Sequence, residues 1–262
     1  MVTPGSVRYP RAMTALSVNV NKVATVRNSR GGTVPSVVEA AEVCIEAGAA
    51  GITVHPRADE RHIRPADVRD LARALAEHPG VELNVEGDPR PDLVTLVKEV
   101  RPHQCTLVPV LEGEVTSQGG WPRSTDEAAL RRVIAELRAL GIRTSVFVDA
   151  TSEAVAWVHD LGAERVELFT EPFAVAFRRG PAAAEKALAP FVEAAERAHA
   201  LGLGVNAGHD LDEDNLVVFR RVPHLDEVSI GHALVSRAIF DGLGPVVRRY
   251  LAVLGGMNRS SN

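Results

Sequence analysis

The chain has 262 residues, of which 45% are hydrophobic and 24% charged, an ordinary composition for a globular protein with a substantial core. Its 34 acidic residues outnumber 29 basic ones, for a net charge of −5, and aromatic residues make up 4%. These values exclude a whole-protein field that attracts nucleic acid or an anionic membrane, and they leave little for base stacking. The only cysteines, Cys44 and Cys105, have apolar neighbours, and no stretch resembles a signal peptide or a membrane span, so we expect a cytoplasmic protein.

Short apolar, β-branched runs alternate with amphipathic segments along almost the whole chain. The predicted strands are 15–20, 51–55, 81–86, 104–109, 142–148, 165–169, 203–206 and 226–230. Helices are predicted between them: Pro35 and Pro65 open two, and Ser124 with Glu127 resembles a capping box for a third. Eight strand–helix units predict an α/β fold, a single (β/α)8 TIM barrel over 14–254 with flexible tails at 1–13 and 255–262. An open doubly wound sheet is the rival fold, but it gives no reason for eight units.

No glycine-rich nucleotide-binding motif follows any of the predicted strands.

Two of the connections between predicted elements are longer than a barrel needs. The segment 110–124 follows the fourth strand, and 170–182 follows the sixth. Long connections at the catalytic end of a barrel are often lids, and solvated surface excursions are the alternative.

Chemistry in such barrels gathers at the C-terminal ends of the strands, which sorts the polar residues. Residues at these positions are Asn19, Asn21, Lys22, His55, Glu86, His209, Asp210, Gly231 and His232. The same rule prefers Glu86 over Glu82, which lies at the start of its strand and is expected to serve stability. Glu167, in mid-strand, would be buried, either in an ion pair or in a functional role.

Histidines from separate strands that converge with a carboxylate can move several protons in sequence near neutral pH. No HxH or HExxH spacing and no nucleophile signature occurs, so we expect neither a metal nor a cofactor. Gly231 and His232 open a helix whose N-terminus can bind an anion, although an ordinary tight turn would look the same. Arg57 and His62 form a second basic cluster, expected across the barrel, so two phosphate groups are predicted.

Seven segments in order, "NVNKVATVRNSRGG", "GITVHPRADERHIR", "NVEG", "LVP…EVTSQGGW", "RTSVFVD", "VNAGHD" and "IGHAL", resemble the pyridoxine 5′-phosphate synthase family. The similarity runs from about residue 16 to 252. The resemblance implies a (β/α)8 barrel with added helices that assembles as a homo-octamer of dimers. It also implies condensation of 1-deoxy-D-xylulose 5-phosphate with 3-amino-2-oxopropyl phosphate, which releases phosphate and water and uses no cofactor or metal.

The resemblance assigns roles to individual residues. His55 and Glu86 match an acid/base pair, His209 a proton donor on the opposite side, and Glu167 a glutamate that stabilises charge. Contacts to the amino-ketone phosphate would come from Asn19, Arg30, Gly231 and His232, and contacts to the deoxyxylulose phosphate from Arg57, His62 and Thr116. The segment 110–124 would then be a lid.

The chain departs from the best-known members of the family at several of these positions. Asn21 and Lys22 stand where they have Asp and His, Asp210 stands where they have glycine, and Phe169 and Glu171 stand where they have histidine and glycine. We count Asn21, Lys22 and Asp210 among the substrate-binding residues of a subtype. Two other functions remain open: an isomerase or epimerase on a single sugar phosphate, and a non-catalytic binder of a phosphorylated ligand.

Overall fold

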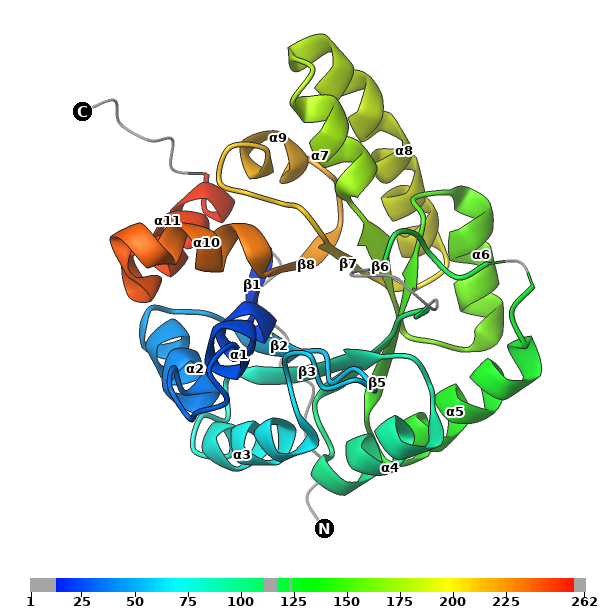
Figure 1. Cartoon of the computed structure of the whole chain (residues 1–262). Coiled ribbons are helices and arrows are strands. Elements are labelled where there is room, and N and C mark those ends of the chain that lie inside the picture. Colours follow the sequence, from blue (N-terminus) through cyan, green and yellow to red (C-terminus); the bar gives the residue numbers. More distant parts are fainter. Residues whose placement is uncertain (1–12, 111–116, 123, 257–262) are drawn as a thin grey trace.

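The computed structural model describes residues 13–110, 117–122 and 124–256. Within these ranges, eight parallel strands close into a barrel in the order in which they occur along the chain (Figure 1). The strands are β1 Ala15–Asn19, β2 Gly51–Val54, β3 Glu82–Gly87, β4 Gln104–Leu107, β5 Arg143–Val148, β6 Arg165–Phe169, β7 Gly204–Gly208 and β8 Leu225–Ile230. The predicted (β/α)8 barrel is therefore confirmed, with strand ends within about two residues of the predicted ones.

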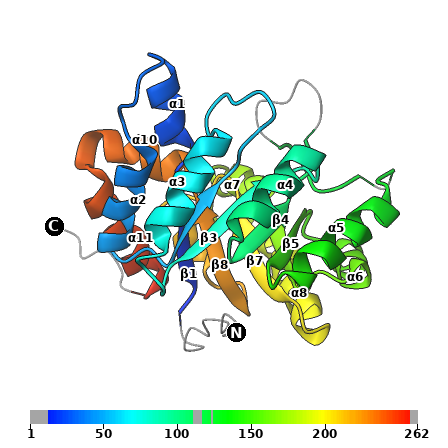
Figure 2. The same ribbon diagram turned by 90° about the horizontal axis from the view of Figure 1, so that it is seen from below.

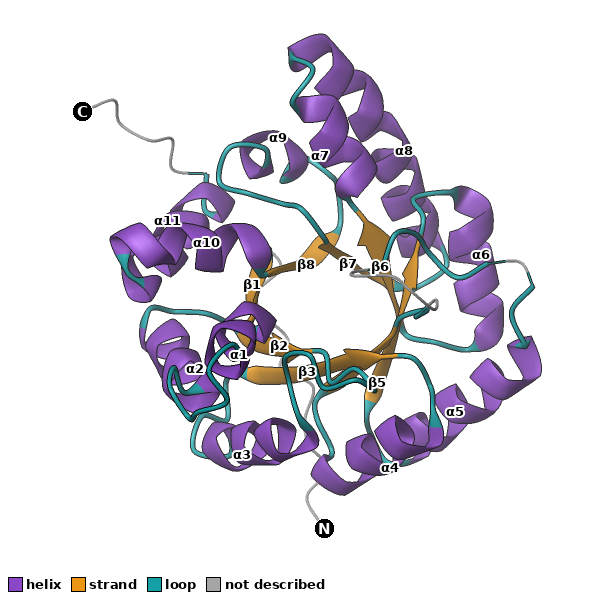
Figure 3. Cartoon of the chain, viewed as in Figure 1, coloured by secondary structure: helices purple, strands orange, loops and turns teal. Residues whose placement is uncertain are grey.

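Helices surround the strands on all sides (Figure 3). They are α1 Asn21–Asn28, α2 Val37–Glu46, α3 Pro65–Leu75, α4 Pro91–Val100, α5 Glu127–Ala139, α6 Ser152–Leu161, α7 Glu171–Phe177, α8 Pro181–Ala200, α9 Leu216–Phe219, α10 His232–Asp241 and α11 Leu243–Leu254. The expected extra helices are present, since α1 follows β1 ahead of α2 and stands at the upper end of the barrel (Figure 2). None of the described helices is long and apolar enough to cross a membrane.

The strands alternate between apolar residues that face the helices and polar residues that face the barrel interior. On β1, for example, Leu16 and Val18 belong to the apolar core, whereas the hydroxyl of Ser17 lies 2.7 Å from that of Thr53 on β2. Because β4 and β7 are not neighbours in the sheet, the bond from Asn206 Nδ2 to Gln104 Oε1 (3.4 Å) crosses the interior. The hydrophobic core therefore lies between the sheet and the helices.

The opening of α5 differs from the prediction. Its N-cap is Asp126, whose side chain accepts a hydrogen bond from Ala129 N–H at 3.1 Å. The capping box predicted from Ser124 and Glu127 is wrong, because the helix begins two residues later and Glu127 instead accepts a bond from Trp157 Nε1 on α6.

Of the two long connections, the segment 170–182 contains α7, which is anchored by an aromatic cluster. Phe173 of α7 lies 6.2 Å from Phe191 of α8 and 5.1 Å from Phe219 of α9, measured between ring centroids. Phe173 is fully buried. This segment is therefore neither an open loop nor a solvated excursion. Its helix, α7, begins at Glu171 and fixes the position of that residue. The segment 110–124 lies partly outside the described residues, as do the predicted tails, which stay predictions.

Candidate active site

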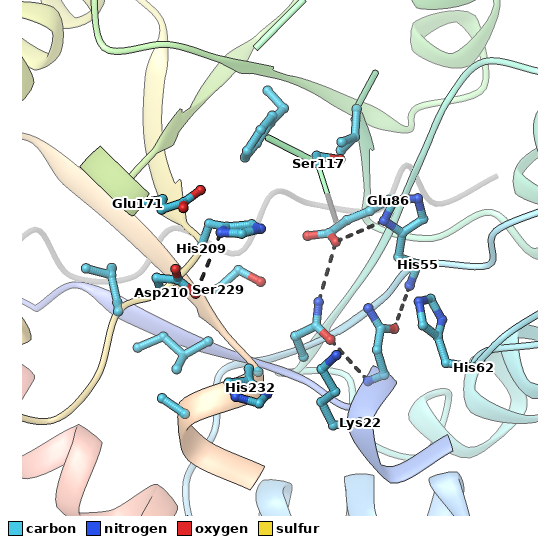
Figure 4. Close-up of a pocket in the computed structure, with 18 of the residues that line it drawn as sticks. Lys22, His55, His62, Glu86, Ser117, Glu171, His209, Asp210, Ser229 and His232 are labelled. Carbon is cyan, nitrogen blue, oxygen red and sulfur yellow. Dashed lines mark hydrogen bonds and ion pairs between the residues drawn. The ribbon is translucent and has the colours of Figure 1, made fainter. Parts of the chain in front are cut away.

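A cavity of about 780 Å³ opens at the C-terminal ends of the strands (Figure 4). All but two of the predicted site residues line it: Asn19, Asn21, Lys22, His55, Arg57, His62, Glu86, Glu167, His209, Asp210, Gly231 and His232. Of the other two, Arg30 is exposed on the turn after α1 and does not line this cavity, and Thr116 lies outside the described residues.

The two basic clusters lie on the same side of the barrel. β2, which precedes Arg57 and His62, and β8, which precedes Gly231 and His232, both pair with β1. The expectation that these clusters face each other across the barrel is therefore wrong. Lys22, at the start of α1, lies close enough for its charge to act on both His62 and His209.

His55 and Glu86 form the buried centre of the cavity. Both side chains are about 10% exposed, and His55 Nδ1 lies 3.9 Å from Glu86 Oε2 (Figure 4). Burial, with the charges of His62 and Arg57, lowers the pKa of His55 to about 3. Burial and the nearby Glu167 raise the pKa of Glu86 well above its usual value. The imidazole of His55 is therefore neutral at neutral pH and can accept a proton, while the raised pKa of Glu86 favours its protonated form, which can donate one.

Two asparagines hold this pair in place. Asn21 Oδ1 accepts a hydrogen bond from the backbone N–H of His55 at 2.9 Å, and Asn19 Oδ1 accepts one from the N–H of Asn21 at 3.1 Å. Asn19 Nδ2 donates to Glu86 Oε2 over 3.5 Å. In this chain Asn21 therefore positions His55 through its backbone, a role that an aspartate could also fill because only an acceptor is needed.

His62 presents a hydrogen-bond donor to the cavity. Its Nδ1 accepts from the N–H of Ile63 at 2.9 Å, which leaves the proton of the neutral ring on Nε2. Burial and the charge of Lys22 lower the pKa of His62 to about 4, so the ring is neutral. Arg57 is 6% exposed in the same wall. A neutral imidazole donor beside a guanidinium is a suitable environment for a phosphate group.

Glu167 lies inside the barrel, as expected for a buried carboxylate. It is 3% exposed, and its Oε2 has no hydrogen-bond partner among the described residues. Burial and the charge of Glu227 raise the pKa of Glu167 to about 8. A Cβ on Gly208 would lie 2.6 Å from Glu167 Oε1, so glycine at this position on β7 makes room for the carboxyl group.

Glu82 has the structural environment that was expected of it. It forms an ion pair with Arg143 at the opposite end of β3 from Glu86. Burial alone would raise the pKa of Glu82, but the hydrogen bond and the charge of Arg143 outweigh burial and lower it. Glu82 does not line the cavity.

Several cavity residues escaped the sequence prediction, above all Glu171, Ser117 and Ser229. The sequence marks Glu171 only as a departure from the family, because the long connection after β6 gives no sign of the helix that begins there. Ser229 could have been found, since it follows the polar alternation of β8. Among the described residues, Glu171, His209 and Asp210 are the one group of three metal-type donors within 4.8 Å of one another. The charge of Lys22 acts on the same histidine and disfavours a metal cation beside these three residues. The absence of a metal stays a prediction.

Comparison with known proteins identifies the family. The profile described as "Pyridoxal phosphate biosynthesis protein PdxJ" matches residues 16–256. The chain belongs to the PdxJ family. It is 49% identical over 239 residues to a pyridoxine 5′-phosphate synthase of Porphyromonas gingivalis, covering 91% of this chain and 98% of that one. It is 51% identical over 251 residues to that of Xanthomonas campestris, covering 93% and 97%.

Solved structures outside the PdxJ family share the fold. The 3-keto-L-gulonate-6-phosphate decarboxylase of Vibrio cholerae aligns with a TM-score of 0.60 at 12% identity, covering 92% of this chain and 99% of that one. The phosphoribosyl anthranilate isomerase of Thermus thermophilus aligns at 0.57 and 15% identity, covering 94% and 100%. At such identities the likeness concerns the barrel alone.

Proposed function

We propose that this PdxJ-family enzyme is a pyridoxine 5′-phosphate synthase. It would condense 1-deoxy-D-xylulose 5-phosphate with 3-amino-2-oxopropyl phosphate and release inorganic phosphate and water. The observation that carries the proposal is one cavity that holds the buried His55–Glu86 pair together with two groups of anion-binding residues. Relatives about 50% identical over nearly their whole length bear this name.

In this proposal the substrates divide the cavity between them. Arg57 and the Nε2–H of His62 bind the phosphate of the deoxyxylulose substrate. The N-terminus of α10, at Gly231 and His232, binds the amino-ketone phosphate, since its first N–H groups have no partner within the helix. Asn19 contributes to the second set. Two separate sets favour a condensation over an isomerase that acts on a single sugar phosphate.

The proton transfers follow from the protonation states. The neutral His55 takes protons from the condensing carbons, and the protonated Glu86 gives a proton to the departing oxygen. His209 serves as a second proton donor at β7. Glu167, 3% exposed between them, stabilises positive charge that develops on the imine nitrogen once it is ionised. Three proton-handling groups give a non-catalytic binder no advantage.

The test is an absorbance assay with purified protein and both substrates, with each substrate omitted in turn as a control. We expect pyridoxine 5′-phosphate and an equimolar amount of inorganic phosphate. Arg57→Ala and His232→Asn should each raise the KM of a different substrate. If both substrates bind but no product forms, or if both variants weaken one and the same ligand, the proposal is wrong.

We further propose self-association, as the family resemblance implies with a homo-octamer. Large apolar side chains are exposed on α10 and α1, which pack against each other: Ile239 is 72% exposed, Phe240 81% and Val26 50%. Such a surface suits a second copy of the chain. Light scattering should give the mass of an octamer, and Phe240→Glu should lower it. A monomer at micromolar concentration would contradict this.

The proposed cytoplasmic setting rests on the two buried, free cysteines.

A further inference from the structure

The turn after β7 holds two consecutive residues in the left-handed region of backbone conformation. His209 has a φ of 88° and Asp210 a φ of 60°, and residues other than glycine rarely adopt such values. Each such residue costs on the order of 1 kcal/mol and persists only where the surroundings enforce it. Aspartate adopts this region more readily than most residues but at a higher cost than glycine, so its side chain should have a use.

Two buried side chains enforce this turn from either side. The hydroxyl of Thr170, fully buried before α7, donates to Gly208 O at 2.7 Å and contacts His209 O. Asn215, 1% exposed, donates from Nδ2 to Asp210 O at 3.0 Å. The position of His209 therefore depends on the same segment that begins α7.

The side chains of this turn converge on the imidazole. Asp210 Oδ1 lies 3.8 Å from His209 Nδ1, and Glu171 approaches from the start of α7 (Figure 4). One carboxylate oxygen from each acid and one ring nitrogen of His209 all lie within 4.8 Å of one another. His209 Nδ1 is buried and makes no hydrogen bond among the described residues. The ring of Phe169 packs edge-on against the imidazole, 5.2 Å between centroids, and limits its rotation.

The charges around His209 come from three elements. Burial and Lys22, on α1, favour the neutral imidazole, whereas Asp210, in the turn, and Glu171, on α7, favour the cation. The first two prevail, and the pKa of His209 is lowered. Without the two carboxylates the pKa of His209 would fall further, because the two charges that favour its cationic, proton-donating form would be gone.

We propose that Glu171 and Asp210 are positioning residues for His209, which orient its imidazole and stabilise its cationic form until it donates a proton. The inference rests on the proposed function, in which His209 is a proton donor. It also explains why a cavity that receives two phosphate groups carries two carboxylates at its β6–β7 side. Their negative charge is partly offset by Lys22, whose charge reaches the same histidine, and by the imidazolium whenever His209 is protonated, which weakens their repulsion of the substrates.

NMR titration of the imidazole tests the inference without substrate, so the result does not depend on the proposed function. The His209 signal is assigned by its loss in His209→Asn. We expect its pKa to fall by about one unit in Asp210→Asn and again in Glu171→Gln, since an opposite charge at this distance shifts a pKa by about one to three units. Asp214→Asn, a carboxylate exposed in the same loop and away from the cavity, should change nothing. Circular dichroism confirms that each variant is folded.

The pH dependence of kcat supplies the second measurement. A proton donor loses activity as the pH rises through its pKa, so the alkaline limb should move to lower pH by the same amount in both variants. An imidazole titration that neither variant moves would overturn the inference, as would an alkaline limb that stays in place while kcat falls. If the titration moves in the variants but the unmodified protein forms no product from the two substrates, the pairing stands and the proposed function fails.

Discussion

Glu82→Gln and Glu86→Gln form a matched pair of variants, because the same chemical change is made on the same face of β3. The two residues differ only in surroundings. Glu82 is 6% exposed and paired with Arg143, whereas Glu86 is 8% exposed and contacts neutral groups. We expect Glu82→Gln to lower stability and leave catalysis nearly intact, and Glu86→Gln to do the reverse.

The magnitudes follow from these contacts. Removing one partner of a buried ion pair costs about 3–5 kcal/mol. Arg143 is 18% exposed and keeps a 2.9 Å bond to Gln104, so the lower value, about 3 kcal/mol, applies. For a chain of this size this lowers Tm by roughly 6–12 °C. Glu86→Gln leaves no charge behind, so Tm should change little, while kcat falls about 10²- to 10⁴-fold with the loss of a proton-transferring group.

Thermal denaturation and steady-state kinetics of the unmodified protein, Glu82→Gln and Glu86→Gln test this expectation. Substrate binding measured by calorimetry shows whether Glu86→Gln still binds both ligands, as we expect. Equal losses of kcat in the two variants at equal Tm would refute the reasoning, because burial and pairing would then not separate the two carboxylates.

Three further predictions concern single residues. Because burial raises the folded pKa of Glu167 to about 8 from 4.5, stability should fall between these pH values by on the order of 5 kcal/mol, and urea denaturation of Glu167→Gln should show a smaller fall. Asn21→Ala leaves the N–H of His55 without its acceptor, so it should lower the free energy of unfolding by about 1–3 kcal/mol and should also lower kcat. Asn21→Asp keeps the acceptor and should preserve both quantities in the same assays. A Cβ on Gly120 would lie 2.5 Å from Asp149 N, so Gly120→Ala should displace residues 117–122 and raise KM. An unchanged pH dependence, an inactive Asn21→Asp or an unchanged KM would contradict these expectations in turn.

The barrel and the centre of its site could be predicted from the sequence for a topological reason. Eight repeats define a closed order of strands, and the end of each strand then places His55, Glu86 and His209 at one end of the barrel. The same closed order places β2 and β8 on either side of β1, so it also implies that the two basic clusters lie near each other.

Other features depend on contacts that no local pattern contains. Asp126 and Ser124 are both good helix caps, and only the packing of α5 selects the first. Glu171 approaches His209 across 38 residues of sequence because α7 packs against α8 and α9, which a segment read as a loop does not suggest. Arg30 shows the opposite: it follows α1 closely in sequence, but it is exposed and does not line the cavity.

The polar lining of the barrel has a consequence for how this sequence can change. Each strand belongs to two regions at once, and the parity of a position decides which one a substitution affects. On β3, Leu83 and Val85 face the helices, where volume matters, whereas Asn84, between Glu82 and Glu86, faces an interior with few apolar contacts to lose. Drift among relatives should therefore alternate along every strand, with outward positions conserving size and inward positions conserving the balance of charge and hydrogen bonds. New chemistry could be introduced from within the barrel at little cost to the shell that holds it together.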